Sequence, residues 1–381
     1  MTLATEPALR AGLETVWAYL HECVGARQHA LADRLVTREA RLHNPPWLGP
    51  DGRGAAGVRD HLVLLHRAFP DLRAEVDDLF GAGDRVVARL THRGTHRGPW
   101  LGVPATGREV EFSQTLIFRV EDGPGGRIAE MWQEADALGT LITLGAAPPL
   151  GTTSALRALG WAIAAAHHRA HHRVPQDQPW PWRGTDRQHT AAFRGALSGT
   201  APASADLLEA NVLPLRRWIA ECVNEQAVHI CQEIFHETYR GHSPPHAEPE
   251  PLRGPKGYER FIRGILTGFP DAKATIEDLI PVGDRVACRV RMTGTHLGPY
   301  RGLPPTGRPF TLGQIVICRI EDGKIVESWQ EIDALGLMLG FGVVPRPGSG
   351  SAGYLLWFAR LAATLATAPR RIAAAHKGAR A

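Results

Sequence analysis

The chain carries the same succession of motifs twice, and this repeat constrains its fold more than any other feature of the sequence. Gly94-Thr95-His96 and Trp132-Gln133-Glu134 return about 200 residues later as Gly294-Thr295-His296 and Trp329-Gln330-Glu331. A repeat of this period is too long for one unit of a solenoid. It therefore indicates two homologous domains in tandem.

The extent of the matching sequence predicts where the domains lie. The two copies cover residues 12–146 and 207–343, and each has about 130 residues, a size at which one domain can bury its own core. Residues 147–206 lose the repeat and are rich in Pro, Gly, Ala, Arg and His, which is typical of a connector with room for one helix.

The last segment, residues 344–381, is predicted to be a helical tail. Its apolar run begins at Tyr354 and has about 15 residues, whereas a helix that crosses a bilayer needs roughly 20. We expect it to pack against a domain or the connector. An amphipathic helix on a membrane surface is the alternative.

Composition excludes several classes of protein. The 381 residues are 44% hydrophobic and 22% charged, with a net charge of +4. The basic residues are spread along the chain, so a nucleic-acid-binding protein is not expected. No segment is predicted to span a membrane, so an integral membrane protein is not expected either. The five cysteines are odd in number and lack CxxC spacing, which indicates buried thiols in a reducing compartment and neither disulfides nor zinc. Because the N-terminus lacks a signal-peptide pattern, we expect a cytoplasmic protein.

Each copy changes its hydrophobic period in the same order. Helical spacing covers residues 12–42 and 208–240, and two shorter helices are predicted over the ranges 57–69 and 257–269. Alternating strands follow at residues 85–90 and 115–120, and at residues 285–290 and 315–320 in the second copy. Glu121-Asp122-Gly123 and Glu321-Asp322-Gly323 predict hairpin turns after the last of these strands. Helices followed by a meander predict an α+β domain, in which the helices cover one face of a curved antiparallel sheet.

The motifs themselves carry a resemblance. Both copies contain, in order, His-x-Pro-Pro or a variant of it, Phe-Pro-Asp, Gly-Asp-Arg-Val, Gly-Thr-His-x-Gly-Pro and Trp-x-x-x-Asp-x-Leu-Gly. This order resembles the SnoaL-like polyketide cyclase (ester cyclase) family of the nuclear transport factor 2-like superfamily, nearly end to end in each copy. The resemblance implies a cone-shaped α+β barrel with a deep apolar pocket. It also implies a cofactor-free enzyme of secondary metabolism that closes a ring in a polyketide ester by an intramolecular aldol reaction.

Carboxylates are the catalytic candidates. The resemblance implies that the Asp of the last motif, Asp136 or Asp333, is the acid/base, a role open to a carboxylate whose pKa is raised by apolar walls. Capping or ion pairing at the strand end is the alternative. Since side chains alternate along a strand, Trp132 and Glu134 share the face of Asp136, as Trp329 and Glu331 share that of Asp333. Glu134 and Glu331 are therefore either paired catalytic carboxylates in the pocket or turned outward by a bulge.

Polar residues elsewhere in the motifs are candidates for binding the substrate. Gln114 and Gln314 open a central strand between apolar neighbours and can polarise a substrate carbonyl. The histidines of the motifs either orient the substrate or bond the loops that hold them, and Trp132 and Trp329 supply apolar surface. The full set is His43, His96, Gln114, Trp132, His242, His296, Gln314 and Trp329.

No metal or cofactor is expected. The four histidines of the connector, His167, His168, His171 and His172, have helical spacing but no supporting Cys or carboxylate, and no phosphate loop or dinucleotide fingerprint is present. The expected partner is a small polyketide-like molecule, and the two copies are expected to pack as an internal pseudo-dimer. Two other functions stay open: an epoxide-opening cyclase, hydratase or isomerase on the same scaffold, and a non-catalytic binding or scaffolding protein.

Overall fold

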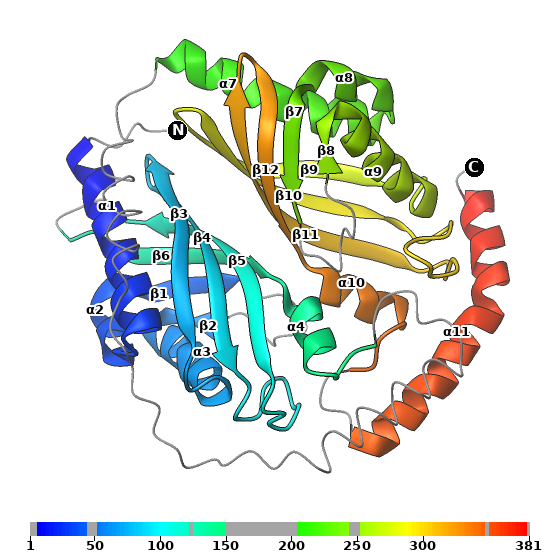
Figure 1. The fold of residues 1–381 in the computed structure, drawn as a ribbon, viewed down its shortest axis with the longest axis horizontal. Helices are drawn as coiled ribbons and strands as arrows, with labels where there is room; N and C mark the ends of the chain where they lie inside the picture. Colours follow the sequence, from blue (N-terminus) through cyan, green and yellow to red (C-terminus); the bar gives the residue numbers. More distant parts are fainter. Residues whose placement is uncertain are drawn as a thin grey trace. The chain divides into compact units, whose positions relative to one another are not determined.

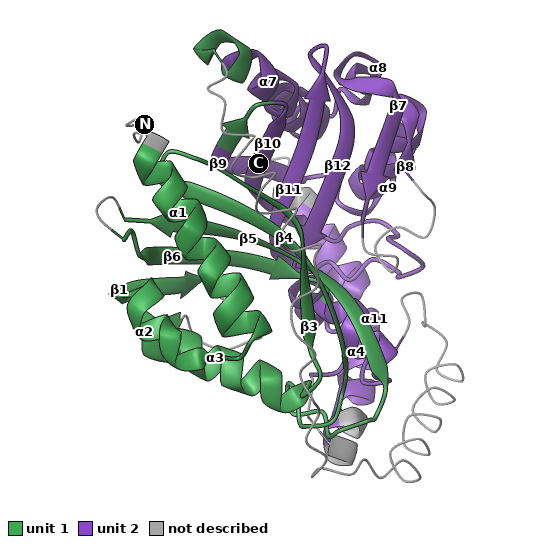
Figure 2. Cartoon of the chain, turned by 60° about the vertical axis from the view of Figure 1, so that its left-hand side comes forward, with its two compact units in different colours: residues 1–136, 172–208, 280–283 green, residues 137–171, 209–279, 284–381 purple. Residues whose placement is uncertain are grey.

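The computed structural model describes residues 6–43, 52–121, 125–148, 204–243, 252–346 and 350–378 (Figure 1). It divides into two compact units, which Figure 2 shows in green and purple. Each copy of the repeat supplies the sheet of one unit. The domain limits 12–146 and 207–343 stay predictions, and the connector lies almost wholly outside the described residues.

Each sheet has six strands. The order is β2-β1-β6-β5-β4-β3 in the first sheet and β8-β7-β12-β11-β10-β9 in the second. The strands of the first sheet are β1 (Val36–His43), β2 (Gly52–Arg53), β3 (Arg73–Ala82), β4 (Arg85–Thr95), β5 (Glu109–Val120) and β6 (Ile128–Ala135). Those of the second are β7 (Phe235–His242), β8 (Leu252–Arg253), β9 (Lys273–Val282), β10 (Arg285–Thr295), β11 (Pro309–Glu321) and β12 (Lys324–Ile332).

Helices precede and follow each group of strands, so the α+β class is confirmed. The first copy has α1 (Glu6–Ala18), the π-helical turn η1 (Tyr19–Gly25), η2 (His29–Leu31), α2 (Ala32–Leu35), α3 (Gly54–Ala68) and α4 (Ala137–Thr143). The second has α7 (Ala205–Arg217), the π-helical turn η4 (Trp218–Asn224), η5 (Val228–Ile230), α8 (Cys231–Ile234), α9 (Gly254–Gly268), α10 (Ala334–Phe341) and the tail helix α11 (Gly350–Gly378).

The long helical pattern at the start of each copy is partly wrong, because its last residues form a strand. β1 pairs with β6, and the register shifts by a bulge between Val36 and Arg41. The bulge separates the buried residues Val36 and Ala40 by four positions, as a helix would. Spacing alone therefore could not distinguish this strand from a helical turn.

The sheets are mixed, whereas an antiparallel sheet was expected. β1 runs parallel to β6, and β7 runs parallel to β12. The antiparallel pairs are β1–β2, β3–β4, β4–β5, β5–β6, β7–β8, β10–β11 and β11–β12. The predicted hairpin is present in the second copy, where Asp322 and Gly323 alone connect β11 to β12 and both have positive φ. In the first copy this turn lies partly outside the described residues.

The Gly-Thr-His-x-Gly-Pro motif fixes a loop against the preceding helix. The Asp271 carboxylate accepts a hydrogen bond of 2.7 Å from the backbone N–H of Thr295. A Cβ on Gly298 would overlap the carbonyl oxygen of Thr267, so only glycine allows this approach. Asp71 binds Thr95 in the same way in the first copy. The motif thus has a structural role in both copies.

The tail helix α11 packs against the second copy. Arg371 donates from Nε to the carbonyl oxygen of Thr306 over 2.8 Å, and Trp357 Nε1 donates to that of Gly342 over 3.2 Å. In the described part of the chain, no helix combines the length and the apolar character needed to cross a membrane. All five cysteines are buried free thiols.

Candidate functional site

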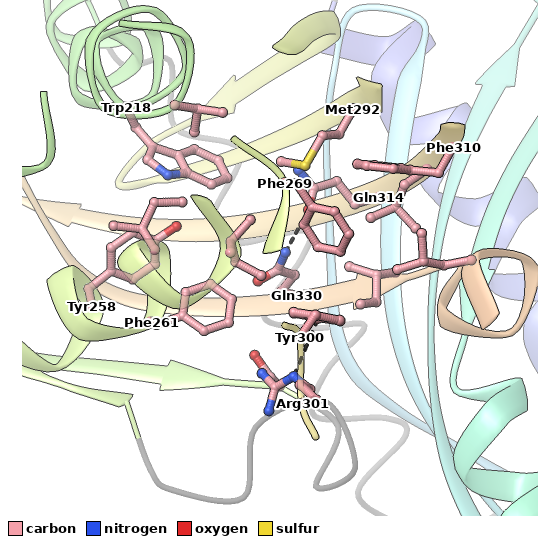
Figure 3. A pocket seen from close by; sticks show the side chains of 17 residues that line it. Trp218, Tyr258, Phe261, Phe269, Met292, Tyr300, Arg301, Phe310, Gln314 and Gln330 are labelled. Atoms are coloured by element: carbon pink, nitrogen blue, oxygen red, sulfur yellow. Dashed lines mark hydrogen bonds between the residues drawn. The ribbon is translucent and has the colours of Figure 1, made fainter. Parts of the chain in front are cut away.

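The second copy encloses an apolar pocket between its sheet and α9 (Figure 3). Its cavity volume is about 50 Å³, enough for a few water molecules. The helix contributes one face, because its pocket residues follow the i, i+3, i+4, i+7 spacing of a helical stripe. The lining residues are Trp218, Val223, Ser243, Tyr258, Phe261, Ile262, Ile265, Phe269, Met292, Tyr300, Arg301, Phe310, Leu312, Gln314, Gln330, Ile332 and Leu337.

Two glutamines interrupt the apolar walls. Gln330 on β12 donates from Nε2 to Oε1 of Gln314 on β11 over 2.6 Å, the dashed contact near the centre of Figure 3. Gln314 is 2% exposed. The strands direct both amides inward, because residues 310, 312 and 314 alternate onto one face of β11.

Two N–H donors of this pocket lack acceptors. Among the described residues, neither Nε2 of Gln314 nor Nε1 of Trp218 has a hydrogen-bond partner, and both atoms are buried. A buried donor without a partner costs about 1–3 kcal/mol. Trp218 is the first residue of η4, and π-helical turns are frequent at functional sites. The pocket therefore offers two donors to the oxygen atoms of a ligand.

At the equivalent position, the first copy has a longer series of hydrogen-bonded polar side chains. Gln114 donates from Nε2 to Oε1 of Gln133 over 2.8 Å, and His92 lies 2.8 Å from Oε1 of Gln114 through its Nε2. His92 occupies the position that Met292 has in the second copy, since they pair with Phe112 and Leu312 respectively. Burial lowers the pKa of His92 to about 4, so the ring is neutral near pH 7.

The proton on His92 follows from its partner. A carbonyl oxygen only accepts, so Nε2 carries the hydrogen and donates it to Gln114. Nδ1 is then an acceptor, and it has no partner within the described residues. The interior of the first copy thus holds an unpaired acceptor, whereas that of the second holds unpaired donors.

The predicted carboxylates do not line the pocket of the second copy. Asp333 is 8% exposed and caps α10, where its Oδ1 accepts from the backbone N–H of Gly336 over 2.7 Å. It lies between the lining residues Ile332 and Leu337. Asp136 follows β6 at the equivalent position and is also 8% exposed.

Alternation on β12 places the other predicted residues on the opposite face. Gln330 and Ile332 face the pocket, so Trp329 and Glu331 point away from it. Glu331 is only 6% exposed, so this face is not open to solvent there. No register shift occurs between Glu327 and Ile332, so the bulge that was considered as an alternative is absent from this segment.

Two predicted histidines join the tryptophans on that opposite face. The ring of His242 stacks on Trp329 with centroids 5.3 Å apart, and its Nε2 lies 2.9 Å from Oε1 of Glu327. His43 stacks on Trp132 at 5.0 Å in the same way. The structure brings these residues together, but it does not place His242 or Trp329 in the pocket of their copy.

The motif histidines His96 and His296 are fully buried inside their loops. Each contacts a threonine hydroxyl through Nδ1 at 3.1 Å, Thr106 in the first copy and Thr306 in the second. Burial lowers the pKa of each to about 4. His296 stacks on Phe341 at 4.4 Å and packs at 5.5 Å against Phe269, a lining residue, but does not line the pocket itself.

Sequence reasoning found Gln114 and Gln314 but missed Trp218, His92 and the glutamines bonded to that pair, Gln133 and Gln330. A signal for His92 exists, because Val86, Ala88 and Leu90 precede it on the same face of β4. A polar residue that continues an apolar face is the pattern that identified Gln114. Trp218 has no such signal, since an aromatic residue on a helix is typical of a core.

The ligand sets that bind metals in proteins are built mainly from His, Cys, Asp and Glu side chains. No group of three or more His, Cys, Asp or Glu side chains suited to a metal occurs among the described residues. The four connector histidines lie outside them. The polar groups of the pocket are the amides of Gln314 and Gln330, the indole of Trp218, the guanidinium of Arg301 and the hydroxyls of Ser243, Tyr258 and Tyr300, and among apolar neighbours they fit an organic ligand.

Comparisons with known proteins identify relatives of both copies. The family model for SnoaL-like polyketide cyclase matches residues 14–144 and 214–339. Aklanonic acid methyl ester cyclase DnrD of Streptomyces peucetius is 30% identical over 126 residues, 32% of this chain and 86% of DnrD. The cyclase of the same name from Streptomyces sp. (strain C5), DauD, is 32% identical over 109 residues, 28% of this chain and 66% of DauD. Wild-type IdmH of Streptomyces antibioticus aligns at 29% identity with a TM-score of 0.32, covering 35% of this chain and 98% of IdmH.

Proposed function

The chain belongs to the SnoaL-like polyketide cyclase family, and from this premise we propose that it closes a ring in a polyketide ester by an intramolecular aldol reaction without a cofactor. The substrate binds in the apolar pocket of the second copy, which has to widen beyond its about 50 Å³ to admit it, and at the equivalent place in the first copy. The polyketide ester named in its relatives, aklanonic acid methyl ester, is the model for the substrate class.

The observation that carries this proposal is the pair of buried donors in the second copy. An aldol closure places negative charge first on an enolate oxygen and then on an alkoxide oxygen. Gln314 Nε2 and Trp218 Nε1 lack partners among the described residues, so they can donate to such an oxygen without breaking a bond in the protein. Fixed donors in an apolar site stabilise developing charge more than water does.

The proton balance of the reaction requires one acid/base. A base removes a proton from the carbon next to a carbonyl, the resulting carbanion attacks a second carbonyl, and the alkoxide that forms takes the proton back. We assign this role to Asp136 and Asp333, as the family resemblance implies. Asp333 does not itself line the pocket, but it follows the lining residue Ile332 directly in the sequence.

Two roles for Glu331 can be separated by substitution. If it forms a catalytic pair with Asp333, Glu331→Gln lowers turnover as much as Asp333→Asn does. Its place on the face opposite Gln330 supports a structural role, so we expect turnover to remain within about threefold of the wild type. Glu134 is expected to behave alike in the first copy. His43, His242, Trp132 and Trp329 are proposed to support the sheet rather than the substrate.

The function is tested by incubating the full chain with a polyketide methyl ester and identifying the product. Ring closure leaves the mass of the ester unchanged and creates a new carbon–carbon bond, which NMR detects. A hydratase would instead add the mass of one water. Substrate that binds but is recovered unchanged, and that exchanges no carbon-bound hydrogen in D2O, would show a binding protein and contradict the proposal.

A further inference from the structure

A second cavity lies where the tail helix α11 packs on the second copy. Its volume is about 530 Å³, and it shares no lining residue with the pocket that contains Gln314. α10 and the segment after it form one wall, and α11 forms the other. The lining residues are Arg308, Leu339, Gly342, Val344, Arg346, Gly353, Leu356, Trp357, Arg360, Ala363, Thr364, Thr367 and Arg371. We refer to this cavity as the arginine groove.

The charge in the arginine groove has one sign. Four of its described lining residues are arginines, and none of them is Asp or Glu. The surrounding sequence has the same bias, because Asp333 is the last acidic residue of the chain. The cations after it are Arg346, Arg360, Arg370, Arg371, Lys377 and Arg380. The residues after Asp333 therefore include no carboxylate side chain that could neutralise these arginines.

Two of the four guanidinium groups are held in place by neutral acceptors. Arg308 donates from Nη2 to Oγ1 of Thr364 over 2.9 Å and from Nη1 to the carbonyl oxygen of Gly340 over 3.0 Å. Arg371 donates to Thr306 and Thr367. Burial and the charge of Arg371 both lower the pKa of Arg308, which shows two like charges close together. An anion in the groove would relieve this repulsion.

The remaining surface of the groove is apolar. Trp357 is 6% exposed and has its indole N–H bonded to Gly342, so its ring presents an apolar face. Leu339, Val344 and Leu356 extend that surface. A bare inorganic anion would leave it uncovered. The lining thus matches a ligand with an anionic head and an apolar body.

We propose that the arginine groove binds an amphiphilic organic anion, with a carboxylate or phosphate head beside Arg308, Arg360 and Arg371 and an apolar body along Trp357. This site goes beyond the cyclase activity. Two kinds of molecule have such an anionic head and apolar body: a free acid in solution and a membrane lipid. Arg360 is the informative side chain, because it is exposed and makes no hydrogen bond or ion pair within the described residues.

The test titrates the full chain by calorimetry with dodecyl phosphate and with dodecanoate, each below its micelle-forming concentration, and with uncharged dodecanol. We expect saturable binding of one molecule of either anion. Arg360→Glu should weaken this binding about tenfold or more, since it replaces an attraction by a repulsion. Arg370→Glu is the matched control, because Arg370 lies exposed on the same helix outside the groove, and it should stay within about twofold.

Three outcomes would overturn the proposal: equal weakening by Arg360→Glu and Arg370→Glu, equal affinity for dodecanol, or no binding of either anion. Vesicles separate the two sources. Co-sedimentation with phosphatidylglycerol but not phosphatidylcholine vesicles, lost in Arg360→Glu alone, identifies a lipid head group as a ligand of the groove. Binding to vesicles without any binding of the monomeric anions contradicts a site of this kind.

Discussion

At the scale of single residues, one difference between the copies reverses a chain of hydrogen bonds. In the first copy His92 donates to Oε1 of Gln114, whose Nε2 then donates to Gln133. In the second, Met292 cannot donate, and Gln314 accepts from Gln330 instead. Both glutamines could be predicted from the sequence, since each interrupts an apolar strand face. The direction of their amides could not, because it depends on a neighbouring strand.

The buried histidines predict that acid destabilises the fold. Burial lowers the pKa of His92 to about 4, against about 6.5 in an unfolded chain. Between these values the unfolded state binds a proton that the folded state does not, so stability falls as the pH is lowered. The slope is about 1.4 kcal/mol per pH unit for each such group. His96 and His296 add to it.

The contribution of His92 is measured from urea unfolding between pH 7 and pH 4.5. We expect His92→Met to reduce the pH slope of the free energy of unfolding by about one proton. His229→Gln, at an exposed position of η5, is the matched control, and its slope should lie closer to that of the wild type than the slope of His92→Met does. Parallel curves for the wild type and His92→Met would show that His92 is not buried as a neutral ring.

Two substitutions of Asp333 distinguish its role as a helix cap from a role as a catalytic carboxylate. Asn caps a helix as well as Asp does, so Asp333→Asn should keep the bond to Gly336 and the melting temperature. It removes the carboxylate, and the turnover of the second copy should fall about 100-fold. Asp333→Ala should in addition lose about 1 kcal/mol of stability. If Asp333→Asn is fully active and only Asp333→Ala is impaired, Asp333 is a cap and no more.

At the scale of elements, the sequence predicts α3, α9, the hairpin of β11 and β12 and the helical tail, because each has a period or a turn of its own. The sequence predicts helix where β1 and β7 lie, because a bulge in each strand separates its buried residues by four positions, as a helix would. Their parallel pairing with β6 and β12 depends on residues far away in the sequence. No local pattern records such a pairing.

The docking of α11 depends on one glycine. Gly307 has φ of +63°, and a Cβ on it would lie 2.6 Å from Cβ of Arg371. Gly307→Ala should therefore displace the helix as well as strain the turn. Gly323 has φ of +72° with nothing within 4 Å, so Gly323→Ala measures the strain alone. We expect limited proteolysis to cleave within α11 of Gly307→Ala first. Equal protection of α11 in both variants would contradict this packing.

At the scale of the whole molecule, the question is how many of the two copies work. Both keep the glutamine pair and the aspartate that follows β6 or β12. The prediction that they pair as a pseudo-dimer stays a prediction. Two working sites predict partial loss of turnover in Asp136→Asn and in Asp333→Asn and near-complete loss in the double variant. Full activity in the double variant would remove both carboxylates from the mechanism.

We propose that the amide donor of Gln314, which has no partner among the described residues and is buried in the second copy, binds the reacting oxygen of a polyketide ester. The sharpest test compares the initial rate of ring closure in Asp136→Asn, in which the second copy alone works, with that in Asp136→Asn/Gln314→Met, in which residue 314 keeps its shape and loses its N–H groups. Loss of one such donor typically lowers the rate about 100-fold or more. We expect a loss of this size with an unchanged fold by circular dichroism. A rate within twofold of that of Asp136→Asn would contradict the proposal.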